Sequence, residues 1–321
     1  MKMTMKKKYL LFAAAALTLA ACSNDDENLD GGPVELRLSS GIEVQEVPRA
    51  ATDIQNEAFD ANEKIDVYIN EATAGTPSTD YPQPMVYTQA TTGNSLNPPS
   101  GEQPYFPSSG SGVTIHAVYP SSSETFTTGG YATDTESNTT FTIQTDQSEN
   151  KNYKLSDLMY GQANNGNEVE RTDQTIPLFF THLLSKVTVI LKAGAGLVDA
   201  DLDGAKVELL GVKPTTTITM ASGTIGVAAG TETDIHVFTA TSSALSGSAI
   251  VVPQQLPVQF VRVSLADGGV LTGTLNDNTQ PDLVTGNAYA YTITVNLTAL
   301  NISASITGWD EYNYDGTASM R

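Results

Sequence analysis

The stretch Ser185-Lys186-Val187-Thr188-Val189-Ile190-Leu191-Lys192 indicates the fold class of this 321-residue chain. Apolar side chains recur at every second position, at Val187, Val189 and Leu191. A period of two residues places these side chains on one face of a β-strand. The stretch therefore predicts a strand with a buried face.

The same alternation recurs on both sides of this stretch. It is found in VELRL from Val34, KIDVYIN from Lys64, VTIHAVY from Val113, QFVRVSL from Gln259, AYAYTITVNL from Ala288 and LNISASI from Leu300. Gly-, Pro- and Asn-rich segments separate these runs. About a dozen or more short strands divided by turns are typical of β-sandwiches rather than of a parallel α/β sheet. We therefore expect an all-β protein with two β-sandwich domains, 33–180 and 181–321.

The charge and the cysteine count exclude several classes of protein. The chain has 36 Asp and Glu against 16 Lys and Arg, a formal net charge of −20. Such an acidic chain repels phosphate, so we expect no nucleic-acid partner. Its one cysteine, Cys22, excludes a disulfide framework within the chain.

The N-terminus predicts export and lipid attachment. Residues 1–21 combine a lysine-rich start with an apolar stretch of the length of a signal peptide. The sequence Leu19-Ala20-Ala21-Cys22 resembles a bacterial lipobox, in which the cysteine thiol takes the lipid. The alternative is an ordinary secretory signal in which Cys22 falls by chance.

Residues 22–32 predict a solvated acidic tether. They contain the run Ser23-Asn24-Asp25-Asp26-Glu27, which resembles the surface-export signal of Bacteroidales lipoproteins. That resemblance points to the outer face of the outer membrane.

The residues that could carry chemistry are few. His116, His182 and His236 have no metal-ligand spacing to one another or to the cysteine. The segment from Asp199 to Gly204 begins like an EF-hand loop, but its twelfth position is Leu210 instead of a bidentate Glu. It fits a turn between strands, with a loose surface calcium site as the alternative. We predict no catalytic residue, no cofactor, no metal centre and no enzymatic activity.

Arg49 lies in an expected loop between two predicted strands. Pro48 precedes it, and the small residues Ala50 and Ala51 follow. An exposed, extended loop is what a protease requires. The alternative is an ordinary connecting loop.

Several elements occur in an order that resembles the Bacteroidales fimbrillins, the type V pilus subunits, over nearly the whole mature chain. They are the lipobox at Cys22, Arg49-Ala50, LMYG from Leu158, LFFTHLLSKV from Leu178, VPQQ from Val252, GNAYAY from Gly286 and ITGW from Ile306. Each is weak alone, and their joint order is more specific.

The resemblance implies transthyretin-like sandwiches and assembly by strand exchange. A subunit reaches the surface as an outer-membrane lipoprotein, and an arginine-specific protease cuts it, here between Arg49 and Ala50. The cut removes the first strand, 34–47, and the alternating side chains Val34, Leu36 and Leu38 leave a groove. A strand from a neighbouring pilus subunit, commonly from its C-terminal segment, then fills this groove.

The donor would be sought near the C-terminus of this chain. Leu300, Ile302, Ala304 and Ile306 alternate and could fill an apolar groove. Alternatively, 300–306 is the last core strand of its own domain, and Trp309–Arg321 is the donor or a surface extension. The leading function is a shaft or adhesive tip subunit of a pilus. The alternative is a surface lipoprotein that does not polymerise, either an anchor or a module that binds glycan or host protein.

Overall fold

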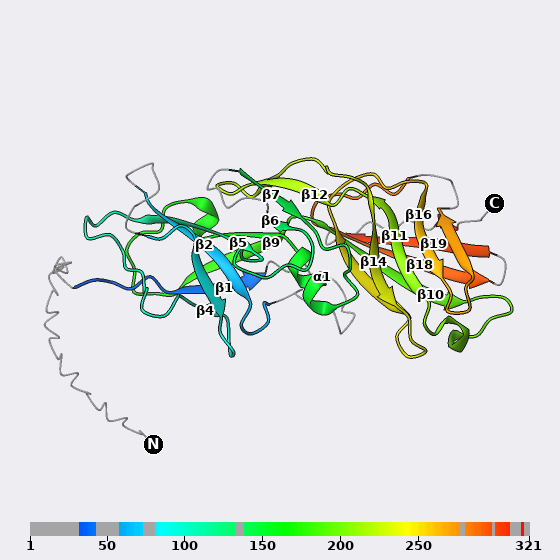
Figure 1. Ribbon diagram of the computed structural model, residues 1–321. Coiled ribbons are helices and arrows are strands. Elements are labelled where there is room, and N and C mark those ends of the chain that lie inside the picture. The colour runs from blue at the N-terminus through cyan, green and yellow to red at the C-terminus, as the bar shows by residue number, and fades with distance from the viewer. Residues whose placement is uncertain are drawn as a thin grey trace, which may run out of the picture. The chain divides into compact units, whose positions relative to one another are not determined.

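The computed structural model describes residues 32–42, 58–72, 81–131, 138–275, 280–296, 299–308 and 316–317 (Figure 1). Strands dominate these residues, so the all-β prediction is confirmed. The helical elements are α1 (Asn150–Ser156), η1 (Asn164–Gly166) and η2 (Asp199–Leu202). None of the helices in these ranges is long and apolar enough to cross a membrane.

Seven strands form a sheet that closes on itself as a barrel. Their order is β1 (Leu38–Ile42), β4 (Ser95–Asn97), β3 (Met85–Gln89), β2 (Lys64–Glu71), β5 (Val113–Tyr119), β8 (Met159–Gln162) and β9 (Ile176–His182). The alternating positions point inward: Ile65, Val67 and Ile69 of β2 are fully buried in the barrel core. We expected a two-layer sandwich here. The sheet is closed instead because β1 pairs with both β4 and β9.

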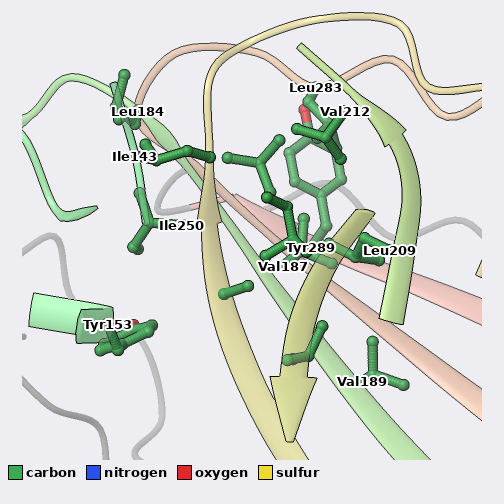
Figure 2. Close-up of a cluster of buried hydrophobic side chains, with 14 of the residues drawn as sticks. Ile143, Tyr153, Leu184, Val187, Val189, Leu209, Val212, Ile250, Leu283 and Tyr289 are labelled. Carbon is green, nitrogen blue, oxygen red and sulfur yellow. The ribbon is translucent and has the colours of Figure 1, made fainter. Parts of the chain in front are cut away.

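Two further sheets share a second hydrophobic core. One has the order β15 (Ser246–Val251), β10 (Ser185–Ala193), β18 (Asn287–Asn296), β19 (Ala299–Gly308) and β20 (Gly316–Thr317). The other has the order β14 (Thr233–Thr239), β11 (Lys206–Val212), β16 (Gln259–Ser264) and β17 (Val270–Thr274). The rings of Phe260 and Tyr291, on β16 and β18, lie 4.9 Å apart between their centroids. Figure 2 shows part of this core, with Val187, Leu209 and Tyr289 labelled.

A fourth sheet joins segments from both halves of the sequence. Its order is β13 (Thr224–Ile225), β12 (Thr215–Thr219), β7 (Asn138–Thr142) and β6 (Gly130–Tyr131). Phe141 and Ile143 are fully buried in the second core. The barrel strand β9 ends at His182 and β10 begins at Ser185, whereas the β7–β12 pairing crosses the expected boundary near residue 180. The domain assignment 33–180 and 181–321 stays a prediction.

Candidate assembly site at the first strand

Strand β1 is hydrogen-bonded along both of its edges. On one side it runs antiparallel to β4, with Leu38 opposite Leu96 and Ser39 opposite Ser95. On the other side it runs parallel to β9 over five residue pairs. Because β1 is the only strand between β4 and β9 in this sheet, its presence determines whether the barrel is closed.

The chain just before β1 is also held by backbone hydrogen bonds. The Leu36 N–H donates to the Pro104 carbonyl at 2.9 Å, and the Phe106 N–H donates to the Val34 carbonyl at 2.8 Å. The side-chain amide of Gln103 donates to the Leu36 carbonyl at 2.9 Å. The ordered first segment therefore extends from residue 34 to the end of β1.

Three side chains of this segment enter the barrel core. Leu36, Leu38 and Ile42 are 1%, 2% and 6% exposed. Val34 is partly buried and packs against the same core. The predicted displaced-strand residues Val34, Leu36 and Leu38 are thus brought together on one apolar face.

Ser40 interrupts this apolar face with a polar contact. Its hydroxyl donates to the Gln89 side-chain oxygen at 2.7 Å, and both residues are buried. The Gln89 amide nitrogen in turn donates to the Gly93 carbonyl at 3.0 Å. The groove of the barrel core that holds residues 36–42 is called the seat of the first strand. It accepts large apolar residues at 36, 38 and 42 and a small polar residue at 40.

Gly41 faces the other side of the sheet, where it meets Phe179 of β9. The two residues are directly paired, and Phe179 is 55% exposed. A Cβ atom at position 41 would lie 3.4 Å from the Phe179 ring, so a small side chain is the most that fits there without a shift of the ring. Sequence reasoning missed Ser40, Gln89 and Phe179. Only the break at Ser40 in the apolar alternation could have signalled a special position.

The predicted donor residues lie on β19. This strand pairs antiparallel with β18 over ten residues, with Ile302 opposite Ile293 and Ala304 opposite Tyr291. Ile302 is fully buried in the second core. On the other side of β19, Ala304 pairs with Gly316 of β20. Leu300 and Ile306 also occupy ladder positions of β19.

The lipidation and cleavage residues Cys22, Arg49 and Ala50 lie outside the described residues, as do the signal peptide and residues 43–57. Of residues 34–47, which were predicted to be removable, the described part ends at Ile42.

The histidines have structural partners. The Nδ1 atom of His182 lies 2.9 Å from a buried Asp157 oxygen, and that of His236 lies 3.0 Å from an Asp146 oxygen. His116 stacks on Tyr68 with ring centroids 4.8 Å apart. Burial lowers the pKa of His116 to about 4, because the charged imidazolium is poorly solvated there.

The acidic segment Asp199–Asp203 begins with η2, and two of its carboxylates accept hydrogen bonds from backbone N–H groups. Asp201 accepts from the Val198 N–H at 2.8 Å, and Asp203 accepts from the Ser242 N–H at 3.0 Å. Within the described ranges no group of three or more His, Cys, Asp or Glu side chains could hold a metal ion.

Comparison with known proteins identifies a family whose profile covers most of the chain. The profile of the fimbrillin-like family matches residues 49–309. A Bacteroides uniformis protein named as a candidate fimbrium subunit, Fim1C, is 29% identical over 326 residues, which cover 97% of this chain and 98% of that protein.

Two crystal structures of candidate cell adhesion proteins have a similar fold. The one from Bacteroides uniformis is 25% identical with a TM-score of 0.65, over 87% of this chain and 98% of that chain. The one from Bacteroides ovatus is 20% identical with a TM-score of 0.66, over 88% and 100%. By the extent of the family match and the agreement in fold, the chain belongs to the fimbrillin-like family.

Proposed function

We propose that this protein is a structural or adhesive tip subunit of a cell-surface pilus. It is exported as a lipoprotein through Cys22, cut after Arg49 by an arginine-specific protease and polymerised with other pilus subunits by strand exchange. The observation that carries the proposal is that the barrel is closed by β1, a strand that precedes Arg49 in the sequence.

Removal of residues up to Arg49 would open the barrel between β4 and β9. Both neighbours would then present unpaired backbone edges. The core surfaces that pack against Leu36, Leu38 and Ile42 would be exposed to water. The lost burial would cost roughly 1.5–3 kcal/mol of stability for each of these side chains. A strand supplied by a second subunit restores both the ladder and the burial, which gives assembly its driving force.

The sequence of β19 matches the vacated seat in one register. Residues Leu36-Arg37-Leu38-Ser39-Ser40-Gly41-Ile42 align with Leu300-Asn301-Ile302-Ser303-Ala304-Ser305-Ile306. Large apolar residues coincide at three positions, and a small residue lies beside Phe179. At the fourth inward position Ala304 replaces Ser40, so the side chain fits but does not donate to the Gln89 oxygen. We therefore favour 300–306 of a second subunit over the tail 309–321 as the donor. Because β19 is paired with β18 in the uncut chain, donation requires its release from that sheet.

Cleavage is tested by N-terminal sequencing of the protein sheared from intact cells. A start at Ala50 is the expected result. A blocked, lipidated Cys22 would show that the first strand stays in place, and would contradict the processing step.

The donor register is tested by disulfide trapping in a chain that begins at Ala50 and so lacks Cys22. In the proposed register Ser303 takes the position of Ser39, which lies opposite Ser95. The pair Ser95→Cys and Ser303→Cys should give covalent oligomers on a non-reducing gel. The matched control, Ser95→Cys with Ser305→Cys, is two residues out of register and should give few. Polymers without cross-links in the first pair would assign the donor to the tail instead.

A surface lipoprotein that does not polymerise, an anchor or a glycan- or host-protein-binding module, is the second candidate. It is supported by the full pairing of β1 and β19 in the uncut chain. In that case the protein keeps its lipid and runs as a single monomer band after surface extraction without heating.

A further inference from the structure

A surface pocket lies beside the segment that precedes β1. It has a volume of about 410 Å³ and is formed by residues 81–85 and 102–108. This volume lies within the range of about 300–1,000 Å³ that is typical of small-molecule sites. We propose that this pocket binds a neutral saccharide in the uncut chain, in which residues 34–36 hold its walls by hydrogen bonds.

The walls of the pocket offer flat apolar surface. Tyr105 is 40% exposed, and it lines the pocket with the rings of Pro82, Pro104 and Pro107. The C–H faces of a sugar ring stack on such aromatic and pyrrolidine surfaces. An exposed tyrosine also combines an apolar ring with a hydroxyl that can hydrogen-bond.

Hydrogen bonds hold the walls of the pocket in place. The hydroxyl of the buried Tyr81 donates to the Tyr105 carbonyl at 2.7 Å, which fixes the backbone that carries the exposed ring. Phe106 anchors the same segment in the barrel core and donates its N–H to the Val34 carbonyl. A preformed site loses little conformational entropy on binding.

The polar groups of the walls favour a ligand rich in hydroxyl donors. The Gln103 amide nitrogen already donates to the Leu36 and Pro104 carbonyls, so this side chain offers its oxygen as an acceptor. Glu102 adds a carboxylate, which is acceptor-only when ionised. Sugar hydroxyls donate to such groups.

The charge of the walls excludes acidic sugars. Of the described residues that line the pocket, Glu102 is the acidic one, and none is a lysine or arginine. The whole chain carries a formal charge of −20. A sialic acid, uronic acid or sulfate would be repelled.

A proline-rich peptide is the competing occupant, because aromatic grooves bind such segments. Its backbone presents mostly carbonyl acceptors, since proline has no N–H. The carbonyl oxygens of the peptide would then face the acceptor oxygens of Glu102 and Gln103. The walls therefore match a polyol, whose hydroxyl groups donate, better than a proline-rich peptide.

The test uses the chain from residue 23 to 321 with Cys22 absent and β1 present. Saturation-transfer NMR is recorded with glucose, galactose, mannose, fucose, N-acetylglucosamine, N-acetylgalactosamine and lactose, and with glucuronic acid and N-acetylneuraminic acid. Signals from at least one neutral sugar and from neither acid are expected. The Kd of the best sugar is then measured by titration calorimetry.

Variants separate the pocket from the rest of the surface. Tyr105→Ala should weaken the Kd by about tenfold and Tyr105→Phe by much less, because stacking carries most of the effect. Val227→Ala removes another exposed apolar side chain, 86% exposed, and should leave the Kd unchanged. Unchanged thermal unfolding of Tyr105→Ala shows that its fold is intact. Absence of neutral-sugar binding, equal loss in Val227→Ala, or Tyr105-dependent binding of a decaproline peptide alone would overturn the proposal.

Discussion

At the scale of single residues, the seat of the first strand discriminates between side chains because one of its positions, the one that holds Ser40, is polar. Ser40 and Gln89 satisfy each other inside an otherwise apolar core, and a buried amide oxygen without a donor costs about 1–3 kcal/mol. This pair favours one register of the strand bound in the seat, which a uniformly apolar groove would not do. A shift of the strand by two residues would place a large side chain against the Gln89 amide.

Replacement of Ser40 by valine should therefore destabilise the uncut chain by about 1–3 kcal/mol. Urea unfolding measures the change. Ser39→Val is the matched control, because Ser39 points to the other face and is partly exposed, and it should have an effect near zero. The double variant Ser40→Val with Gln89→Leu should recover part of the loss. Equal effects of Ser40→Val and Ser39→Val would contradict the role of the polar pair.

His116 should make stability depend on pH. Its pKa is lowered to about 4 from 6.5, so the fold favours the neutral ring. The associated stability is fully present above about pH 6.5, is lost progressively as the pH falls through this window, and changes no further below about pH 4. The loss is on the order of 2–3 kcal/mol.

The measurement compares urea unfolding of the native chain and His116→Phe, a variant that keeps an aromatic ring against Tyr68, at pH 7 and pH 4.5. The difference in the free energy of unfolding between the two proteins should change by on the order of 2 kcal/mol in favour of the variant at the lower pH. A pH-independent difference would mean that His116 is solvated.

At the scale of elements, the alternation in the sequence predicts strands well and their partners poorly. SKVTVILK is β10 and KIDVYIN lies in β2, because period-two burial is a local property. The closure of the barrel depends on the parallel pairing of β1 with β9, about 138 residues later in sequence, for example Leu38 with Ile176. Such long-range pairing has no local signal. The alternating apolar side chains of the first segment were predictable for the same local reason, whereas Gln89 and Phe179 come from other strands.

The release of β19 should depend on Gly273 of β17. A Cβ atom at this glycine would overlap the Ile302 side chain, so β19 packs directly on glycine backbone. Gly273→Ala should displace the Ile302 side chain and destabilise the packing of β19 against β17 by about 1–3 kcal/mol. Amide hydrogen exchange in β18 and β19 should become faster. Gly269→Ala, where the nearest atom is the end of a leucine side chain at 3.3 Å, is the matched control and should leave these rates unchanged.

At the scale of the whole molecule, the uncut chain closes its own barrel because it contains β1. Cleavage after Arg49 and loss of β1 would leave the barrel open. A chain that begins at Ala50 lacks the three side chains that Leu36, Leu38 and Ile42 place in the core. At roughly 1.5–3 kcal/mol for each, the loss is on the order of 5–9 kcal/mol. For a domain of this size each kcal/mol corresponds to roughly 2–4 °C, so we expect the Tm to fall by on the order of 10–35 °C.

A peptide with the sequence of residues 33–47 should reverse this loss when it is added to the chain that begins at Ala50. It restores hydrogen bonds to β4 and β9 and refills the barrel core, and stabilisation should grow with peptide concentration by mass action. The peptide with Leu36→Asp and Leu38→Asp keeps the backbone but would bury two carboxylates, so it should not raise the Tm. A peptide of residues 299–308 should also stabilise the chain if β19 is the natural donor. A truncated chain with the Tm of the uncut protein, indifferent to all three peptides, would mean that the first strand is not part of the barrel's stability, and assembly by strand exchange would lose its driving force.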